Sequence, residues 1–130
     1  MRTAGLLMLA PALMAAGCSD GCGKRVIERS HSPDGKHSAV LFEANCGATT
    51  GFTTQVAVVD PDGEPDAASL VFAADDGYHQ AEPGYWGGPA AKLEWLGPHR
   101  LRITYAAGAR IFQRKDRKAG VDVELRSDIE

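Results

Sequence analysis

The chain has 130 residues, a formal net charge of −3 and 44% hydrophobic residues, which suits one domain of ordinary size behind a short leader. This mild acidity argues against a nucleic-acid-binding protein, because the sequence has no basic stripe that would neutralise phosphates. The basic cluster at 115–118 is interrupted by an acid and is interpreted as a solvated loop.

Residues 1–17 have the pattern of a secretory signal peptide. Arg2 is followed by an apolar run from Ala4 to Ala16, which is too short for a transmembrane helix of roughly 20 residues. The small residues at the end of this run lead directly into Cys18. That end resembles the lipobox of bacterial lipoproteins, in which the cysteine receives a diacylglycerol thioether and becomes the mature N-terminus. The alternative is an ordinary secretory signal, with Cys18 as a structural thiol.

The lipobox resemblance implies a stable membrane anchor at Cys18, because a lipobox cysteine carries at least two acyl chains. Ser19 directly after the cysteine implies the outer membrane, facing the periplasm, in preference to the inner membrane. The inner membrane stays open as the alternative, because Asp20 follows one residue later. The predicted organisation is a lipoprotein signal peptide at 1–17, a tether at 18–24 and a single all-β domain at 25–130.

Acylation of Cys18 leaves Cys22 and Cys46 as an even pair, which suits an oxidising compartment. A disulfide between them would close a loop of about 25 residues and contribute ~3 kcal/mol in the chain-entropy model. Two unpaired thiols are the alternative. A metal site is not expected at the cysteines, because no Cys-x-x-Cys pair lies beside spaced histidines.

The mature region alternates between short apolar segments and turn residues. Ser32-Pro33-Asp34-Gly35 predicts a tight turn, because proline presets one turn position and glycine accepts a positive φ. Turn signals every ~8–12 residues predict an all-β fold, a single small antiparallel β-sandwich or barrel-like meander of about eight strands. The predicted strands are 26–30, 37–43, 52–60, 69–73, 92–96, 100–105, 109–113 and 121–125.

The loop at 45–51 is the first candidate for ligand binding. Its glycines let the backbone approach a ligand closely, and Asn45, Thr49 and Thr50 offer amide and hydroxyl contacts. The alternative is a tight bend pinned by the disulfide, in which the threonines bond neighbouring backbone groups.

The second candidate is a long irregular loop predicted at 75–89, which is rich in glycine and proline. Tyr78, Tyr85 and Trp86 in this loop would serve recognition, as exposed aromatic residues on loops often do. The alternative is that they fold back and cover one end of the sandwich. Trp95 alternates with other apolar residues and is assigned to the core.

The remaining clusters favour structural roles. Asp60, Asp62 and Glu64 begin like a calcium loop, but the distal bidentate glutamate is missing, so a β-turn is expected. The histidines match no spacing of metal ligands, and neither a metal nor another cofactor is expected. They are His31, His37, His79 and His99.

The segment Cys-Gly-Ala-Thr-Thr-Gly-Phe at 46–52 carries a further resemblance. With Ser-Pro-Asp-Gly at 32–35 and the strand residues at 93–96 and 101–105, it is similar to a group of small uncharacterised bacterial exported proteins, many of them lipoproteins. The resemblance implies export and a small β fold, and it brings no activity with it.

No acid–base pair or nucleophile motif is recognisable, so an enzyme is not expected. The sequence predicts a non-enzymatic interaction or structural module of the cell envelope, held at the membrane through Cys18, with an envelope protein as a possible partner and no nucleic acid. The alternative is a periplasmic inhibitor of an enzyme such as lysozyme, in which Asp75, Asp76 and Glu82 would face a basic target.

Overall fold

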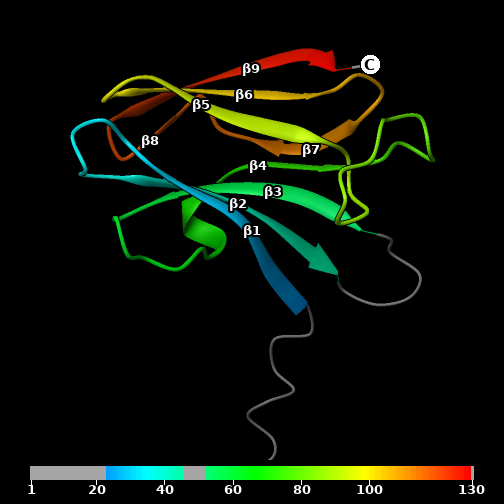
Figure 1. The fold of residues 1–130 in the computed structure, drawn as a ribbon, viewed down its shortest axis with the longest axis horizontal. Helices are drawn as coiled ribbons and strands as arrows, with labels where there is room; N and C mark the ends of the chain where they lie inside the picture. The colour runs from blue at the N-terminus through cyan, green and yellow to red at the C-terminus, as the bar shows by residue number, and fades with distance from the viewer. Residues whose placement is uncertain (1–22, 46–51, 130) are drawn as a thin grey trace, which may run out of the picture.

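The computed structural model, which describes residues 23–45 and 52–129, folds the alternating segments of the sequence into two β-sheets that pack face to face (Figure 1). The predicted all-β sandwich is confirmed. Each of the eight predicted ranges overlaps one strand of the structure. No helix in the described residues is long and apolar enough to cross a membrane.

The first sheet has five antiparallel strands in the order β1-β2-β3-β4-β7. β1 and β2 form the hairpin predicted from the first turn, in which the Gly35 N–H donates to the Ser32 carbonyl oxygen at 2.9 Å. The strands are β1 (Gly23–His31), β2 (Ser38–Asn45), β3 (Thr53–Val59), β4 (Leu70–Asp75) and β7 (Arg110–Arg114).

The second sheet has the order β5-β6-β9-β8, and its β6 and β9 run parallel. The predicted sheet was antiparallel throughout. The difference arises because the chain leaves this sheet after β6, adds β7 to the edge of the first sheet and then returns. The strands are β5 (Ala91–Gly97), β6 (Arg100–Ala106), β8 (Arg117–Lys118) and β9 (Val121–Ile129).

The basic cluster at 115–118, predicted as a solvated loop, is where the chain returns to the second sheet. The Lys115 N–H donates to the Val71 carbonyl oxygen of β4 at 2.9 Å. Arg117 and Lys118 then form β8, in which Arg117 pairs with Asp122 of β9. Backbone pairing therefore orders this cluster, although the basic side chains stay at the surface.

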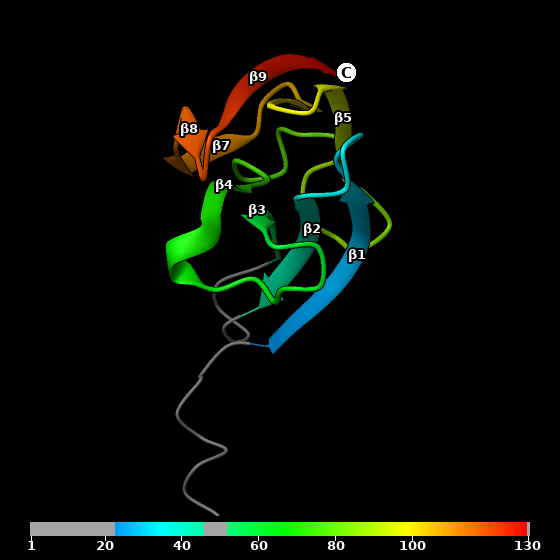
Figure 2. The same cartoon turned by 90° about the vertical axis from the view of Figure 1, so that its left-hand side faces the viewer.

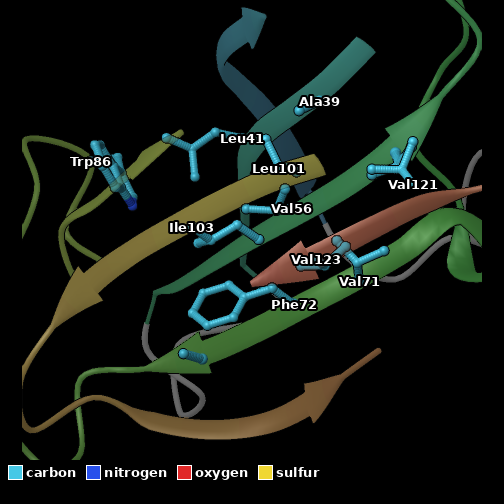
Figure 3. Close-up of a cluster of buried hydrophobic side chains, with 12 residues drawn as sticks. Ala39, Leu41, Val56, Val71, Phe72, Trp86, Leu101, Ile103, Val121 and Val123 are labelled. Carbon is cyan, nitrogen blue, oxygen red and sulfur yellow. The ribbon is translucent and has the colours of Figure 1, made fainter. Parts of the chain in front are cut away.

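The main core lies between the two sheets (Figure 3). Leu101 and Ile103 of β6 point into it as the alternation predicts, and Trp95 of β5 packs at its margin. The Trp95 indole N–H donates to the Ser30 carbonyl oxygen of β1 at 3.0 Å, which joins the edges of the two sheets. The buried members of this core are Ala39, Leu41, Val56, Val58, Val71, Phe72, Ala74, Trp86, Leu101, Ile103, Val121 and Val123.

A second, smaller core lies on the outer face of the first sheet, where β2, β3 and β4 bury Val40, Phe42, Ala57, Val59, Leu70 and Ala73. The segment at 60–69, which includes the short 3-10 helix η2 (Ala67–Ser69), lies on this side of the sheet (Figure 2). Arg29 of β1 and Ser38 of β2 donate to the Pro61 carbonyl oxygen at 3.2 and 2.9 Å. The sequence predicted only a β-turn here, and that turn is present at Asp60–Gly63.

The register of the first sheet aligns the strand ends in one row. Gly23 pairs with Asn45, Thr53 pairs with Asp75, and Asp75 pairs with Arg110. The connection from β4 to β5 and the turn from β6 to β7 leave from this end (Figure 1). We call it the tether end, because β1 begins here. The opposite end, where β5 turns into β6, is called the far end.

Replacing Phe42 by Ala tests whether the outer core contributes to stability. Replacing a buried phenylalanine by alanine in a core costs about 3–5 kcal/mol. F42A should therefore lower the free energy of unfolding by that amount in urea denaturation. Phe112 of β7 is 54% exposed, and F112A should cost less than about 1 kcal/mol. Equal losses for the two variants would contradict an outer core.

Candidate binding surface at the tether end

The connection from β4 to β5, at 76–90, has a defined backbone although it contains no named strand. The Gly84 N–H donates to the Gly88 carbonyl oxygen at 2.8 Å, and the Ala90 N–H donates to the Glu82 carbonyl oxygen at 2.8 Å. These bonds surround an isolated bridge that joins 83 and 89. The glycine-rich loop predicted from the sequence is therefore a small internally hydrogen-bonded hairpin.

Trp86 fastens this hairpin to the first sheet. Its indole N–H donates to the Thr54 hydroxyl of β3 at 2.8 Å, and the Thr54 hydroxyl donates to the Pro89 carbonyl oxygen at 2.6 Å. A Cβ on Gly84 would lie 2.4 Å from the Trp86 ring, so only glycine leaves room for the indole. Trp86 is 8% exposed and belongs to the core. For this residue the alternative prediction, that the loop aromatics fold back over the sandwich, is the one the structure shows.

Tyr85, the neighbour of Trp86, is 79% exposed and lies against Arg25 of β1. The Arg25 guanidinium carbon lies 5.9 Å from the centroid of the Tyr85 ring, within the range of a cation–π contact. The guanidinium also binds the Glu43 carboxylate of β2, with a nitrogen–oxygen distance of 2.7 Å. Glu43 is buried, so this ion pair fixes Arg25 and with it the face on which Tyr85 rests.

Tyr78 repeats the same arrangement at the other edge of the first sheet. It is 81% exposed, and the Arg110 guanidinium carbon of β7 lies 5.7 Å from its ring centroid. Arg110 forms a bidentate pair with the Asp75 carboxylate at the end of β4, in which Nε donates to Oδ1 and Nη2 donates to Oδ2. Hydrogen bonding from Arg110 holds the pKa of Asp75 below its ordinary value, and the same pair raises the pKa of Arg110.

The backbone at Tyr78 is left-handed. Gly77, Tyr78 and His79 have φ values of 60°, 60° and 69°, a conformation that costs a bulky L-residue about 1–2 kcal/mol. Close packing holds it in place, because a Cβ on Gly77 would lie 2.3 Å from the Gly108 carbonyl oxygen. Strained bulky residues concentrate at functional positions, so the strain marks Tyr78 as a candidate binding residue.

Phe52 directly precedes β3 at the tether end and is 45% exposed. A Cβ on Gly87 would lie 2.7 Å from its ring, so Phe52 contacts the hairpin directly. A hollow of about 310 Å³ opens beside it. The residues that line the hollow are Phe52, Asp76, His79, Ala81, Pro83 and Gly87.

The predicted site residues separate into four groups. Tyr78 and Tyr85 are exposed at the tether end, whereas Trp86 is buried. Asn45 is the last residue of β2 and pairs with Gly23. The others, Thr49, Thr50, Cys18, Cys22 and Cys46, lie outside the described residues.

Sequence reasoning missed Phe52, Arg25 and Arg110. Phe52 was counted as a strand residue, and the two arginines stand at strand starts far from the tyrosines in the sequence. The one sequence signal for Phe52 is that an aromatic residue directly follows the candidate loop at 45–51. For the arginines the sequence offers no signal, because their contacts depend on strand order.

Asp75 and His31 take structural roles. Asp75 is bound by Arg110, and Asp76 lies 3.4 Å from the ring nitrogen Nδ1 of His79. Glu82 is the third carboxylate of the proposed acidic group. The His31 ring nitrogen Nδ1 hydrogen-bonds the Ser38 hydroxyl at 2.7 Å. Within residues 23–45 and 52–129, no three His, Cys, Asp or Glu side chains are grouped so that they could hold a metal ion.

Replacing Thr54 by Val tests the attachment of the hairpin. The variant keeps the shape of the side chain but leaves the Trp86 N–H and the Pro89 carbonyl oxygen buried without a partner, at about 1–3 kcal/mol each. We expect a loss of about 2–6 kcal/mol in the free energy of unfolding by urea denaturation. T104V, on the solvent face of β6, should stay within about 0.5 kcal/mol of wild type. A T54V loss no larger than this would contradict the attachment.

The Asp75–Arg110 pair predicts how stability depends on pH. Since the pKa of Asp75 is lower in the folded chain than in the unfolded chain, the ionised carboxylate stabilises the fold above about pH 4, and this contribution is lost as pH falls through the folded pKa. D75N should therefore lose less stability than wild type between about pH 5 and pH 2 in urea denaturation. R110Q should flatten the curve in the same way. A D75N curve parallel to wild type would contradict the pair.

Comparison with known proteins identifies no family model, curated protein or solved structure that matches this chain.

Proposed function

We propose that this chain is an exported lipoprotein of the cell envelope, anchored through Cys18, and that its β-sandwich is a non-enzymatic binding module. One observation carries the proposal. Tyr78 and Tyr85 are both almost fully exposed, yet each rests on a guanidinium that is itself fixed by a carboxylate. The tether end is the proposed binding surface.

Fixed aromatic rings are efficient binding groups. Tyrosine offers a large amphipathic contact area with only two side-chain torsions, so little conformational entropy is lost on binding. Here the Arg25 and Arg110 planes restrict those torsions further. The strained backbone at Tyr78 supports the same conclusion, because its cost of about 1–2 kcal/mol brings no core packing of that side chain.

The register of the hairpin supports the proposed Cys22–Cys46 disulfide. Gly23 pairs with Asn45, and the two cysteines are the next residue before and the next residue after this pair in the sequence. Directly opposed residues of antiparallel strands have Cα atoms about 4.5–5.5 Å apart, and disulfides require about 4.4–6.8 Å. A bridge here would join the tether to the end of β2.

The proposed location follows from the lipobox resemblance. Cleavage before Cys18 and acylation would hold the domain at a membrane surface, and Ser19 favours the outer membrane, facing the periplasm. Inhibition of an enzyme such as lysozyme is the second candidate. Asp76 and Glu82 at the tether end are the carboxylates that would face a basic target.

Site-specific photocrosslinking in cells tests the proposed function. The photoreactive residue p-benzoyl-phenylalanine is placed at Tyr85, at the tether end, or at Leu96, which is 38% exposed near the far end. We expect covalent adducts to protein or lipid from position 85 and few or none from position 96. Adducts to a lysozyme alone would favour the inhibitor.

Mass spectrometry of the same samples checks the anchor. We expect a mature N-terminus at Cys18 that carries a diacylglycerol thioether, and a disulfide-linked peptide containing Cys22 and Cys46 before reduction. An unmodified N-terminus, or equal crosslinking from positions 85 and 96, would contradict the proposed function.

A further inference from the structure

We infer that the tether end docks on the phospholipid surface itself, with Tyr78, Tyr85 and Phe52 at the level of the lipid headgroups. The inference rests on the proposed anchor at Cys18 and names the partner of the proposed binding surface. The partner is a neutral, zwitterionic membrane interface.

The length of the tether brings the domain close to the membrane. The tether was predicted at 18–24, but β1 already begins at Gly23. The five remaining residues, from Cys18 to Cys22, can span at most about 18 Å when fully extended. The headgroup region itself accounts for several ångströms of this reach, since a bilayer is about 40–45 Å thick around a core of about 30 Å. A domain held so closely meets the surface at a high effective concentration, so weak contacts suffice for docking.

The register decides which face the membrane meets. β1 begins at Gly23, and Thr53, Asp75 and Arg110 lie in the same row of strand ends. Phe52 directly precedes Thr53, and Tyr78 follows Asp75 by three residues. The hairpin with Tyr85 leaves from this end too. The exposed aromatic residues therefore lie at the end from which the anchored segment departs, whereas the β5–β6 turn lies at the far end (Figure 1).

The side chains suit a membrane interface. Tyrosine is enriched where hydrocarbon meets headgroups, because its ring is apolar and its hydroxyl stays hydrated. Arg25 and Arg110 lie beside the rings with their charges already paired to Glu43 and Asp75. Each arginine therefore lies at the interface as part of an ion pair whose net charge is zero.

The charges of the tether end select the lipid class. Asp76 and Glu82 pair with neither arginine of the two stacks, and the nearest partner of Asp76 is the ring nitrogen Nδ1 of His79 at 3.4 Å, which carries a positive charge only when the ring is protonated. With a neutral imidazole, both carboxylates add negative charge to this end. An anionic surface would repel these carboxylates, whereas the cationic choline or ammonium groups of zwitterionic headgroups accept them. The docking should therefore need no anionic lipid.

Quenching by brominated lipid tests the docking. The mature acylated protein is reconstituted in phosphatidylcholine vesicles, with or without bromine on the upper acyl chain, and carries Y78W, Y85W or L96W. We expect the added tryptophan at 78 or 85 to lose about half of its fluorescence in brominated vesicles, as an interfacial residue would. Wild type, with Trp86 and Trp95, supplies the background for subtraction.

Leu96→Trp is the matched control, because it adds one tryptophan about 17 Å along β5 from the tether end. Its fluorescence should be unchanged by bromine. Equal quenching of the three variants, or no quenching of Y78W and Y85W, would overturn the inference.

Flotation of the vesicles separates the two levels of the proposal. Protein that fails to float with the vesicles would overturn both the anchor and the docking. Protein that floats without quenching at 78 and 85 would leave the proposed binding module in place and overturn membrane docking alone. Crosslinks from position 85 to an envelope protein, combined with absent quenching, would identify a protein as the occupant instead.

Discussion

The hydroxyl of Thr54 is the constraint on which the tether end depends. It accepts from the Trp86 indole and donates to the Pro89 carbonyl oxygen, and it is fully buried. A buried polar group is costly without partners, and here one hydroxyl satisfies two of them. This pair of bonds ties the hairpin to β3. It thereby fixes Trp86 and so the position of its neighbour Tyr85, whereas Tyr78 is held by the close packing of Gly77 against Gly108.

Each tyrosine then depends on a contact that crosses strands. Arg25 reaches Glu43 on the adjacent strand β2, and Arg110 reaches Asp75 on the adjacent strand β4. Because both pairs lie near the strand ends, the guanidinium faces remain available to the rings above them. The carboxylates of both pairs are largely buried, so the pairs also act as supports that keep the exposed aromatic rings in one orientation.

The strands could be predicted because a period of two residues and turn signals are local properties of the sequence. The parallel pairing of β6 and β9 could not, since alternation is the same in both strand directions. The outer core was missed because Val40 and Phe42 point away from Ala39 and Leu41, so β2 is buried on both faces. An apolar run of this kind shows burial without showing which segment covers it.

The aromatic residues of the tether end illustrate the same limit within one loop. Tyr85 and Trp86 are adjacent, yet one is 79% exposed and the other is in the core. The two residues share the same neighbouring sequence, so the residue that each one contacts decides whether it is buried or exposed. Trp86 meets a hydroxyl of β3, whereas Tyr85 meets a guanidinium of β1. Thr54 and Arg25 are distant in sequence, so their positions follow from strand order alone.

Membrane docking and enzyme inhibition make opposite demands on this surface. An inhibitor would have to present Asp76 and Glu82 to a basic protein, which requires that the tether end be free of the bilayer. A tether of at most about 18 Å leaves too little room for a folded enzyme between that end and the lipid, since even a domain of 100 residues has a radius of gyration near 13 Å. A soluble partner of the anchored protein would therefore bind the sides or the far end of the sandwich, where the turns at 32–37, 60–66 and 98–99 lie.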